Sequence, residues 1–167
     1  TMQAYFQGRK ELFEGLSIYS MEKDWTEYPV LRIDLSGTTY TSQAALDEKL
    51  SSILCKWEGQ YGIDNKYVSP GIRLEAVISA AHESSGQKVV VLVDEYDKPI
   101  MDALGKEDLM DYFRNTLQGF YSVLKSQDDK LRFGFLTGVT KMGKLSVFSG
   151  LNNLKDISML PAYSDIC

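Results

Sequence analysis

The amino-acid sequence predicts an α/β fold, a parallel sheet of three strands flanked by helices. Val89–Val93 is an unbroken run of five aliphatic residues, which is typical of a strand buried on both faces of a parallel sheet. Apolar residues at helical spacing occupy the stretches before and after this run, so strands alternate with helices as they do when crossovers join parallel strands. The three strands are expected near residues 30–35, 89–93 and 131–137.

The N-terminal part is expected to place short helical segments before the first strand. Met2–Phe6 has the pattern of a helix end, closed by Gly8. Apolar residues among charges in residues 9–27 predict a short helix and a loop. Pro29–Leu35 alternates apolar and polar side chains, as a strand does. A chain that starts inside a helix is expected to be a piece of a longer protein.

The middle of the chain is expected to supply the main helices and the other two strands. Helical spacing predicts helices over about 42–61, from Ser69-Pro70 to about Ala81, and over about 106–126. Leu131–Val139 is a second buried strand that ends in small polar residues, and residues 141–167 are weakly patterned.

Composition indicates a single domain over residues 1–167. A net charge of −5 argues against a nucleic-acid-binding surface on this segment. No apolar run is long enough to span a membrane, and nothing resembles a signal peptide. Cys55 and Cys167 lie far apart and His82 is the single histidine, which excludes a structural zinc site and fits a reducing cytoplasm.

Two adjacent carboxylates, Asp94 and Glu95, directly follow the aliphatic strand. Ligands of parallel sheets bind at the carboxyl ends of the strands. At that position Asp94 can hold a hydrated magnesium ion and Glu95 can orient an attacking water, which is the Walker B arrangement of P-loop nucleoside triphosphatases. The alternative is that the strand ends in acidic residues because the chain re-enters solvent there. The pattern alone favours neither interpretation.

The strand near 131–137 is the expected neighbour of the aliphatic strand, and Thr137 and Thr140 lie at its end. In many such ATPases this strand directs a polar side chain at the γ-phosphate and the attacking water. Both threonines are therefore candidate sensor residues. The ordinary alternative is that threonine is simply favoured in strands.

Gly138–Leu145, G-V-T-K-M-G-K-L, resembles the phosphate-binding loop G-x-x-x-x-G-K-[ST]. Leu145 stands where Ser or Thr must coordinate magnesium, and no long apolar-striped helix follows. The segment also comes after the carboxylate pair, whereas the usual order is the reverse. A loop leading into the tail is the favoured interpretation.

Asp97 and Lys98, just beyond the carboxylate pair, are expected to form a solvated ion pair. A nuclease role, in which Asp94, Glu95 and Asp97 bind metal directly, is disfavoured because no lysine-containing strand motif of the nuclease type follows. The negative charge of the chain also argues against it.

Six ordered segments together resemble one family, the bacterial AAA-ATPase-like proteins, and they span essentially the whole chain. The segments are Arg9–Leu16, Lys23–Leu35, Val89–Pro99, Arg114–Lys125, Phe135–Lys141 and Phe148–Ser158. Members of the family begin with a Walker A loop of the type R-R-F-G-K-S, followed by a helix that ends in a sequence like A-Y-F. Ala4-Tyr5-Phe6 matches that helix end. The Walker A loop before it and the restriction-endonuclease-like domain usual after the core are not in this sequence.

The resemblance implies a partial P-loop NTPase-like core with three layers, belonging to a parent protein that binds ATP and Mg²⁺ and hydrolyses ATP. The resemblance assigns the Walker B roles to two residues, with Asp94 as the magnesium ligand and Glu95 as the catalytic base. A sensor role falls on Thr137 or Thr140. Without a phosphate-binding loop, this chain alone is expected to be inactive and to bind neither ATP nor Mg²⁺.

The resemblance also implies a sheet order like 5-1-4-3-2, so the three strands stay contiguous and the strand near 131–137 has a bare edge. Because bare edges invite pairing with another chain, self-association or capping is expected there. A function of a different class remains as the alternative, a non-catalytic protein-interaction module that retains the NTPase fold.

Overall fold

A computed structural model describes residues 1–64, 66–139, 147, 154–158 and 160–163. Its centre is a parallel sheet of three strands, β1 (Val30–Asp34), β2 (Val89–Asp94) and β3 (Leu131–Leu136), in the order β1-β2-β3. The predicted α/β class, the parallel sheet and the contiguous strand order are confirmed.

The strand β2 is central because its side chains are apolar on both faces. Val89, Val90 and Val91 are fully buried, and Leu92 and Val93 expose 8% and 2% of their surface. The edge strand β1 alternates instead, so that Leu31 and Ile33 are fully buried while its other side chains face outward. Burial on both faces is the physical reason for the unbroken aliphatic run at the centre of the sheet.

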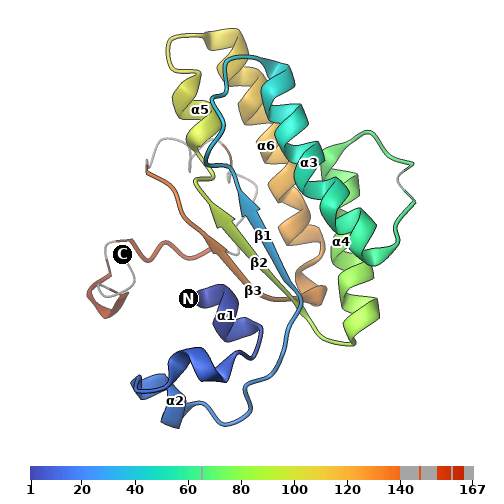
Figure 1. The fold of residues 1–167 in the computed structure, drawn as a ribbon. Coiled ribbons are helices and arrows are strands. Elements are labelled where there is room, and N and C mark those ends of the chain that lie inside the picture. The colour runs from blue at the N-terminus through green and yellow to red at the C-terminus, as the bar shows by residue number, and fades with distance from the viewer. Residues whose placement is uncertain (65, 140–146, 148–153, 159, 164–167) are drawn as a thin grey trace.

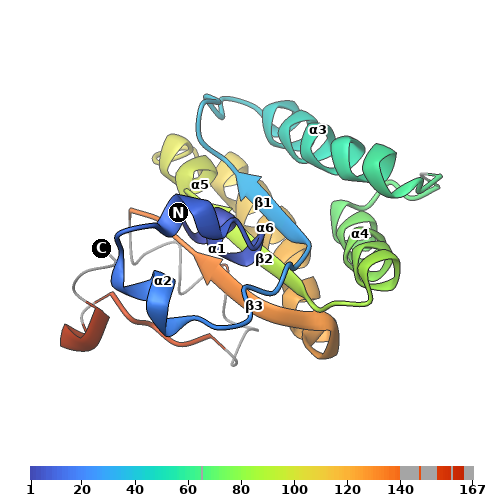
Figure 2. The ribbon, with the colours of Figure 1, turned by 60° about the horizontal axis from the view of Figure 1, so that its bottom comes forward.

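Three long helices cover one face of the sheet, α3 (Gln43–Tyr61), α4 (Pro70–Ser85) and α6 (Glu107–Ser126) (Figures 1 and 2). Ser42 caps α3, its Oγ accepting a hydrogen bond from Ala45 N at 3.3 Å, and Gly62 ends it in the left-handed conformation. The hydrophobic core lies between these helices and the sheet.

Short segments lie on the opposite face, namely α1 (Met2–Phe6), a 3₁₀ turn (Lys10–Phe13) and α2 (Ser17–Met21) (Figure 2). Aromatic rings attach them to the sheet, since Phe6 stacks on Phe133 with 5.2 Å between ring centroids. Tyr28 N also donates a hydrogen bond to Phe6 O at 2.8 Å. The chain thus has three layers, with long helices on one side of the sheet and short ones on the other.

The remaining elements are short. They are α5 (Lys98–Asp102) and the 3₁₀ turns Asp128–Lys130 and Pro161–Tyr163. None of the helices in the described ranges combines the length and apolar character needed to cross a lipid bilayer.

A buried ion pair joins α3 to α4. Arg73 donates to both carboxylate oxygens of Glu58, with Nε–Oε1 at 2.7 Å and Nη2–Oε2 at 2.8 Å. Its Nη1 donates to Ser51 Oγ at 3.0 Å, and Nη2 contacts Cys55 Sγ at 3.2 Å. Both charged side chains are only 6% exposed. The pKa of Glu58 is lowered, chiefly by the hydrogen bonds from Arg73.

The sheet has two outer edges, because β1 and β3 each pair with β2 alone in the described part of the chain. The expectation that Leu131–Val139 forms a second buried strand is wrong: no residue of β3 is buried, and Phe133 is 36% exposed, because this strand lies at an edge of the sheet. Self-association through the edge of β3 stays a prediction.

Candidate functional site

Polar residues from all three strands meet at the carboxyl end of the sheet. Asp94 is the last residue of β2, and the register places it beside Asp34 at the end of β1. Thr137 follows directly after β3. The structure therefore brings together two of the residues expected to act on a ligand, Asp94 and Thr137.

Thr137 forms hydrogen bonds with the end of β2 through both its backbone and its side chain. Its N donates to Val93 O at 2.8 Å, and its carbonyl accepts from Tyr96 N at 3.0 Å. Its Oγ1 then donates to Asp94 Oδ1 at 2.8 Å. This hydrogen bond orients the Asp94 carboxylate.

Arg32 lies on the other side of Asp94 and was not singled out from the sequence. Its Nη2 is 3.4 Å from Asp94 Oδ2 and 3.2 Å from Asp34 Oδ2. Asp34 is itself held by Ser36, whose Oγ donates at 2.6 Å, and this hydrogen bond is the main reason its pKa is lowered. All three charged side chains are 39–49% exposed, so these pairs contribute little to stability.

Glu95 has an unusual backbone conformation. Its φ is +53°, in the left-handed region that a residue other than glycine seldom adopts. Its side chain is half-buried, and its carboxylate forms no hydrogen bond or ion pair with the described residues. Strained backbone conformations of this kind are concentrated at functional sites.

A cavity of about 350 Å³ lies next to these residues, on the face of the sheet that carries α1. Asp94 and Thr137 form part of its wall, together with residues of α1 and the side of β2. Arg9 and Arg32 also line it. Two guanidinium groups beside a carboxylate suit a ligand that carries both an anion and a divalent cation.

Two further predictions concern residues beyond this group. Thr140 lies outside the described residues, as does most of the Gly138–Leu145 segment. The described residues hold no cluster of three His, Cys, Asp or Glu side chains that could bind a metal alone, so Asp94, Glu95 and Asp97 do not form such a site.

The expected solvated ion pair between Asp97 and Lys98 is wrong. Asp97 is only 1% exposed, and its Oδ1 accepts a hydrogen bond from Val139 N at 3.1 Å. Lys98 instead pairs with Asp102 one helical turn later. Asp97 therefore holds the segment after β3 against the segment after β2.

Gly138 is required by the same close approach. A Cβ on this residue would lie 2.5 Å from Tyr96 Cε1 and 2.7 Å from Asp97 Oδ1. Tyr96 and Asp97 expose only 6% and 1% of their surface, so neither can move away freely. The glycine is what allows Thr137 to approach Asp94.

Gly138→Ala is expected to destabilise the fold by about 1–3 kcal/mol, because the added methyl group overlaps buried atoms. Urea denaturation followed by circular dichroism measures this change. Gly134→Ala on β3 is the matched control, since a Cβ there meets no atom within 4 Å. Equal stability of the two variants would show that the two segments are not in close contact.

The chain matches the family described as "Predicted AAA-ATPase" over residues 1–148. It is 40% identical over 168 residues to a protein of Azotobacter chroococcum mcd 1 that is named "Uncharacterized protein in vnfD 5'region". That match covers 100% of this chain and 32% of the relative, so the chain spans about a third of the relative's length. No solved structure matches. The family match covers most of the chain, and the chain therefore belongs to the predicted AAA-ATPase family.

Proposed function

We propose that this chain supplies the magnesium-binding and water-orienting half of an ATPase site, whose phosphate-binding loop belongs to the segment that precedes Ala4 in the family. The hydrogen bond of 2.8 Å between Thr137 Oγ1 and Asp94 Oδ1, on the wall of the cavity, is the observation that carries the proposal. It joins a carboxylate suited to Mg²⁺ to the residue expected to sense the γ-phosphate.

In this proposal the residues have separate tasks, except that Thr137 both positions Asp94 and is the first candidate for the γ-phosphate sensor. Asp94 would hold a hydrated magnesium ion, which needs only one or two carboxylates from the protein. The chemistry that the ion would supply there is electrostatic, an offset of the negative charge on the transferred phosphoryl group. Glu95, whose carboxylate has no described partner, orients the attacking water and accepts its proton. Thr137 holds Asp94 in place, and Thr140 is the second sensor candidate.

The alternative is a non-catalytic interaction module that kept the fold and lost the nucleotide. One observation favours it, since both oxygens of Asp94 already have protein partners in Thr137 and Arg32. In the ATPase, Arg32 must give up its contact of 3.4 Å when magnesium binds.

Titration calorimetry with Mg-ATP distinguishes the two functions. It is performed on this chain and on a longer protein that also contains the preceding segment. Binding by the longer protein alone supports the ATPase. If neither protein binds, the ATPase proposal is contradicted and the interaction module is favoured. If this chain binds unaided, the phosphate site must be sought within it, at Gly138–Leu145.

Thr137→Val in the longer protein is expected to lower kcat about 10–100-fold, because a hydrogen bond to a charged group contributes about 1.5–3 kcal/mol and a tenfold change in rate corresponds to about 1.4 kcal/mol. Phosphate release under steady-state conditions measures it. Thr137→Ser keeps the hydroxyl group and is expected to retain most of the activity. Equal loss in the valine and serine variants would assign the effect to packing and not to the hydrogen bond.

A further inference from the structure

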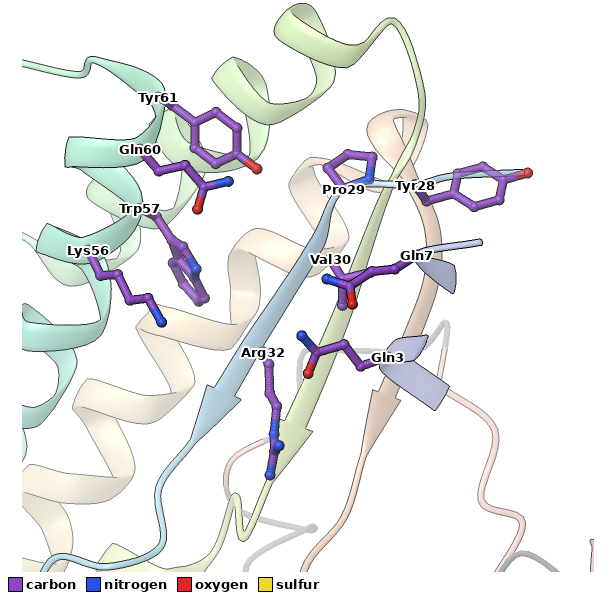
Figure 3. Close-up of a pocket in the computed structure, with 10 residues that line it drawn as sticks. All are labelled: Gln3, Gln7, Tyr28, Pro29, Val30, Arg32, Lys56, Trp57, Gln60 and Tyr61. Carbon is purple, nitrogen blue, oxygen red and sulfur yellow. The ribbon is translucent and has the colours of Figure 1, made fainter. Parts of the chain in front are cut away.

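A second cavity, of about 280 Å³, runs along the outer edge of β1 (Figure 3). One wall is α1 with its C-cap residue, which contribute Gln3 and Gln7, and the other is the C-terminal half of α3, which contributes Lys56 and Gln60. We call it the β1 groove. The proposed ATPase site makes little use of it, since only Gln3 and Arg32 line both cavities.

The floor of the β1 groove is a strand edge with unused backbone groups. Pro29 O accepts from Val90 N, and Leu35 N donates to Asp94 O, so the odd-numbered residues of this strand bond to β2. In a parallel ladder the residues between them direct N–H and C=O to the opposite side. Val30 and Arg32 therefore present two donors and two acceptors to the groove, where β1 pairs with no described strand.

Three carboxamides surround this edge. Gln3 of α1 and Gln7, which caps that helix, reach toward β1 from one side, and Gln60 of α3 reaches toward it from the other (Figure 3). None of the three side-chain amides forms a hydrogen bond with a described residue. A carboxamide both donates and accepts, as a peptide group does, so the three amides can satisfy the polar groups of a bound backbone.

The charge of the β1 groove is opposite to that of the chain. Its described lining residues include Lys56 and Arg32 and no acidic residue, whereas the whole chain carries a net charge of −5. Lys56 is exposed and forms no ion pair with any described residue, while Arg32 already contacts Asp34 and Asp94. The groove therefore favours a negatively charged ligand, with Lys56 as the available cation.

We infer that the β1 groove binds an extended acidic peptide segment of a partner protein, which adds to β1 as a fourth strand. The main-chain hydrogen bonds with Val30 and Arg32 supply the affinity, as they do wherever a peptide adds to a sheet edge. Lys56 then favours peptides with acidic side chains. A second copy of this chain is a poor occupant, because pairing two β1 edges would bring the cations of both grooves together.

Nuclear magnetic resonance of the ¹⁵N-labelled chain tests this inference, with an acetylated and amidated octapeptide of alternating Val and Glu as the probe. At about 5 mM peptide, enough for a millimolar Kd, we expect shifts of the Val30 and Arg32 amides and slower hydrogen exchange at both. A peptide of alternating Val and Lys should bind at least about fivefold more weakly, the scale of one exposed charge interaction.

Lys56→Glu is expected to weaken the acidic peptide about fivefold and to remove the preference over the basic one. Lys66→Glu makes the same change of charge in the exposed segment between α3 and α4 and should leave binding unchanged. Lys56 is exposed, so its replacement should not disturb folding.

Several outcomes would overturn the inference. If no amide resonance shifts at about 5 mM acidic peptide, the β1 groove does not bind such a peptide. Exchange protection at β3 in place of β1 assigns the peptide to the other edge. Protection of Val30 that rises with protein concentration, without peptide, identifies a second copy as the occupant. If wild type and Lys56→Glu bind the acidic peptide equally well, Lys56 does not select for acidic side chains.

Discussion

Glu95→Gln in the longer protein is expected to reduce ATP turnover by about 10²–10⁴-fold while Mg-ATP still binds with nearly unchanged affinity. Glutamine has the size and shape of glutamate but cannot accept a proton from the attacking water, and general-base catalysis contributes a factor of this size. Steady-state phosphate release gives kcat, and titration calorimetry gives the Kd for Mg-ATP. The two measurements together separate catalysis from binding.

The matched control is Glu107→Gln, which makes the same chemical change at an exposed position in the first turn of α6. It is expected to leave both kcat and Kd unchanged. A Glu95→Gln protein that keeps turnover within a factor of about three would remove Glu95 as the base, since even modest general-base catalysis exceeds that factor. A loss of Mg-ATP binding would place Glu95 among the magnesium ligands.

The strands and long helices could be predicted because each carries a strong periodic signal. The helices expected over 42–61 and 106–126 are observed as Gln43–Tyr61 and Glu107–Ser126. The helix α5 (Lys98–Asp102) was not predicted, since five residues that begin with Lys98-Pro99 are too short to show helical periodicity.

The candidate site was predictable only where a pattern marks the end of a strand. Asp94 and Thr137 each lie at such an end, and the parallel sheet brings them together. Arg32 could not be found this way, because its contact with Asp94 depends on the register between β1 and β2. The burial of Asp97 depends on the approach of Val139, which no local pattern encodes.

The positive φ of Glu95 is a further feature that sequence patterns do not reveal. Glutamate is not a residue that usually marks this conformation, as glycine or asparagine would. Two backbone hydrogen bonds flank this residue: Tyr96 N donates to Thr137 O across the sheet, and Lys98 N donates to Glu95 O within the local turn. The contact between Tyr96 and Thr137 and the local turn therefore together constrain the backbone of the proposed base.

The largest effect on stability is expected at the ion pair between α3 and α4. Arg73→Met is expected to lower the free energy of unfolding by about 3–5 kcal/mol, because it leaves the Glu58 carboxylate buried without its partner. For a domain of this size that corresponds to a fall in Tm of about 10 °C. Thermal and urea denaturation measure the change.

A double variant, Glu58→Leu with Arg73→Met, separates the cost of an unpaired charge from the value of the pair. It is expected to recover most of the lost stability, since replacing both buried charges by apolar groups is often neutral or favourable. If the double variant is as unstable as Arg73→Met alone, the loss comes from the packing of Arg73 and from its contact with Ser51.

The dependence of stability on pH gives an independent check on this pair. In the wild type the pKa of Glu58 is lowered in the folded state, so the contribution of the pair is fully present above the ordinary pKa of glutamate. It is lost as the pH falls through the lowered value. In Arg73→Met the buried carboxyl has lost its cation, so burial should raise its pKa and acidification should reduce the difference from wild type. A difference between the two proteins that stays constant down to acidic pH would show that the Glu58 carboxylate is not the destabilising group.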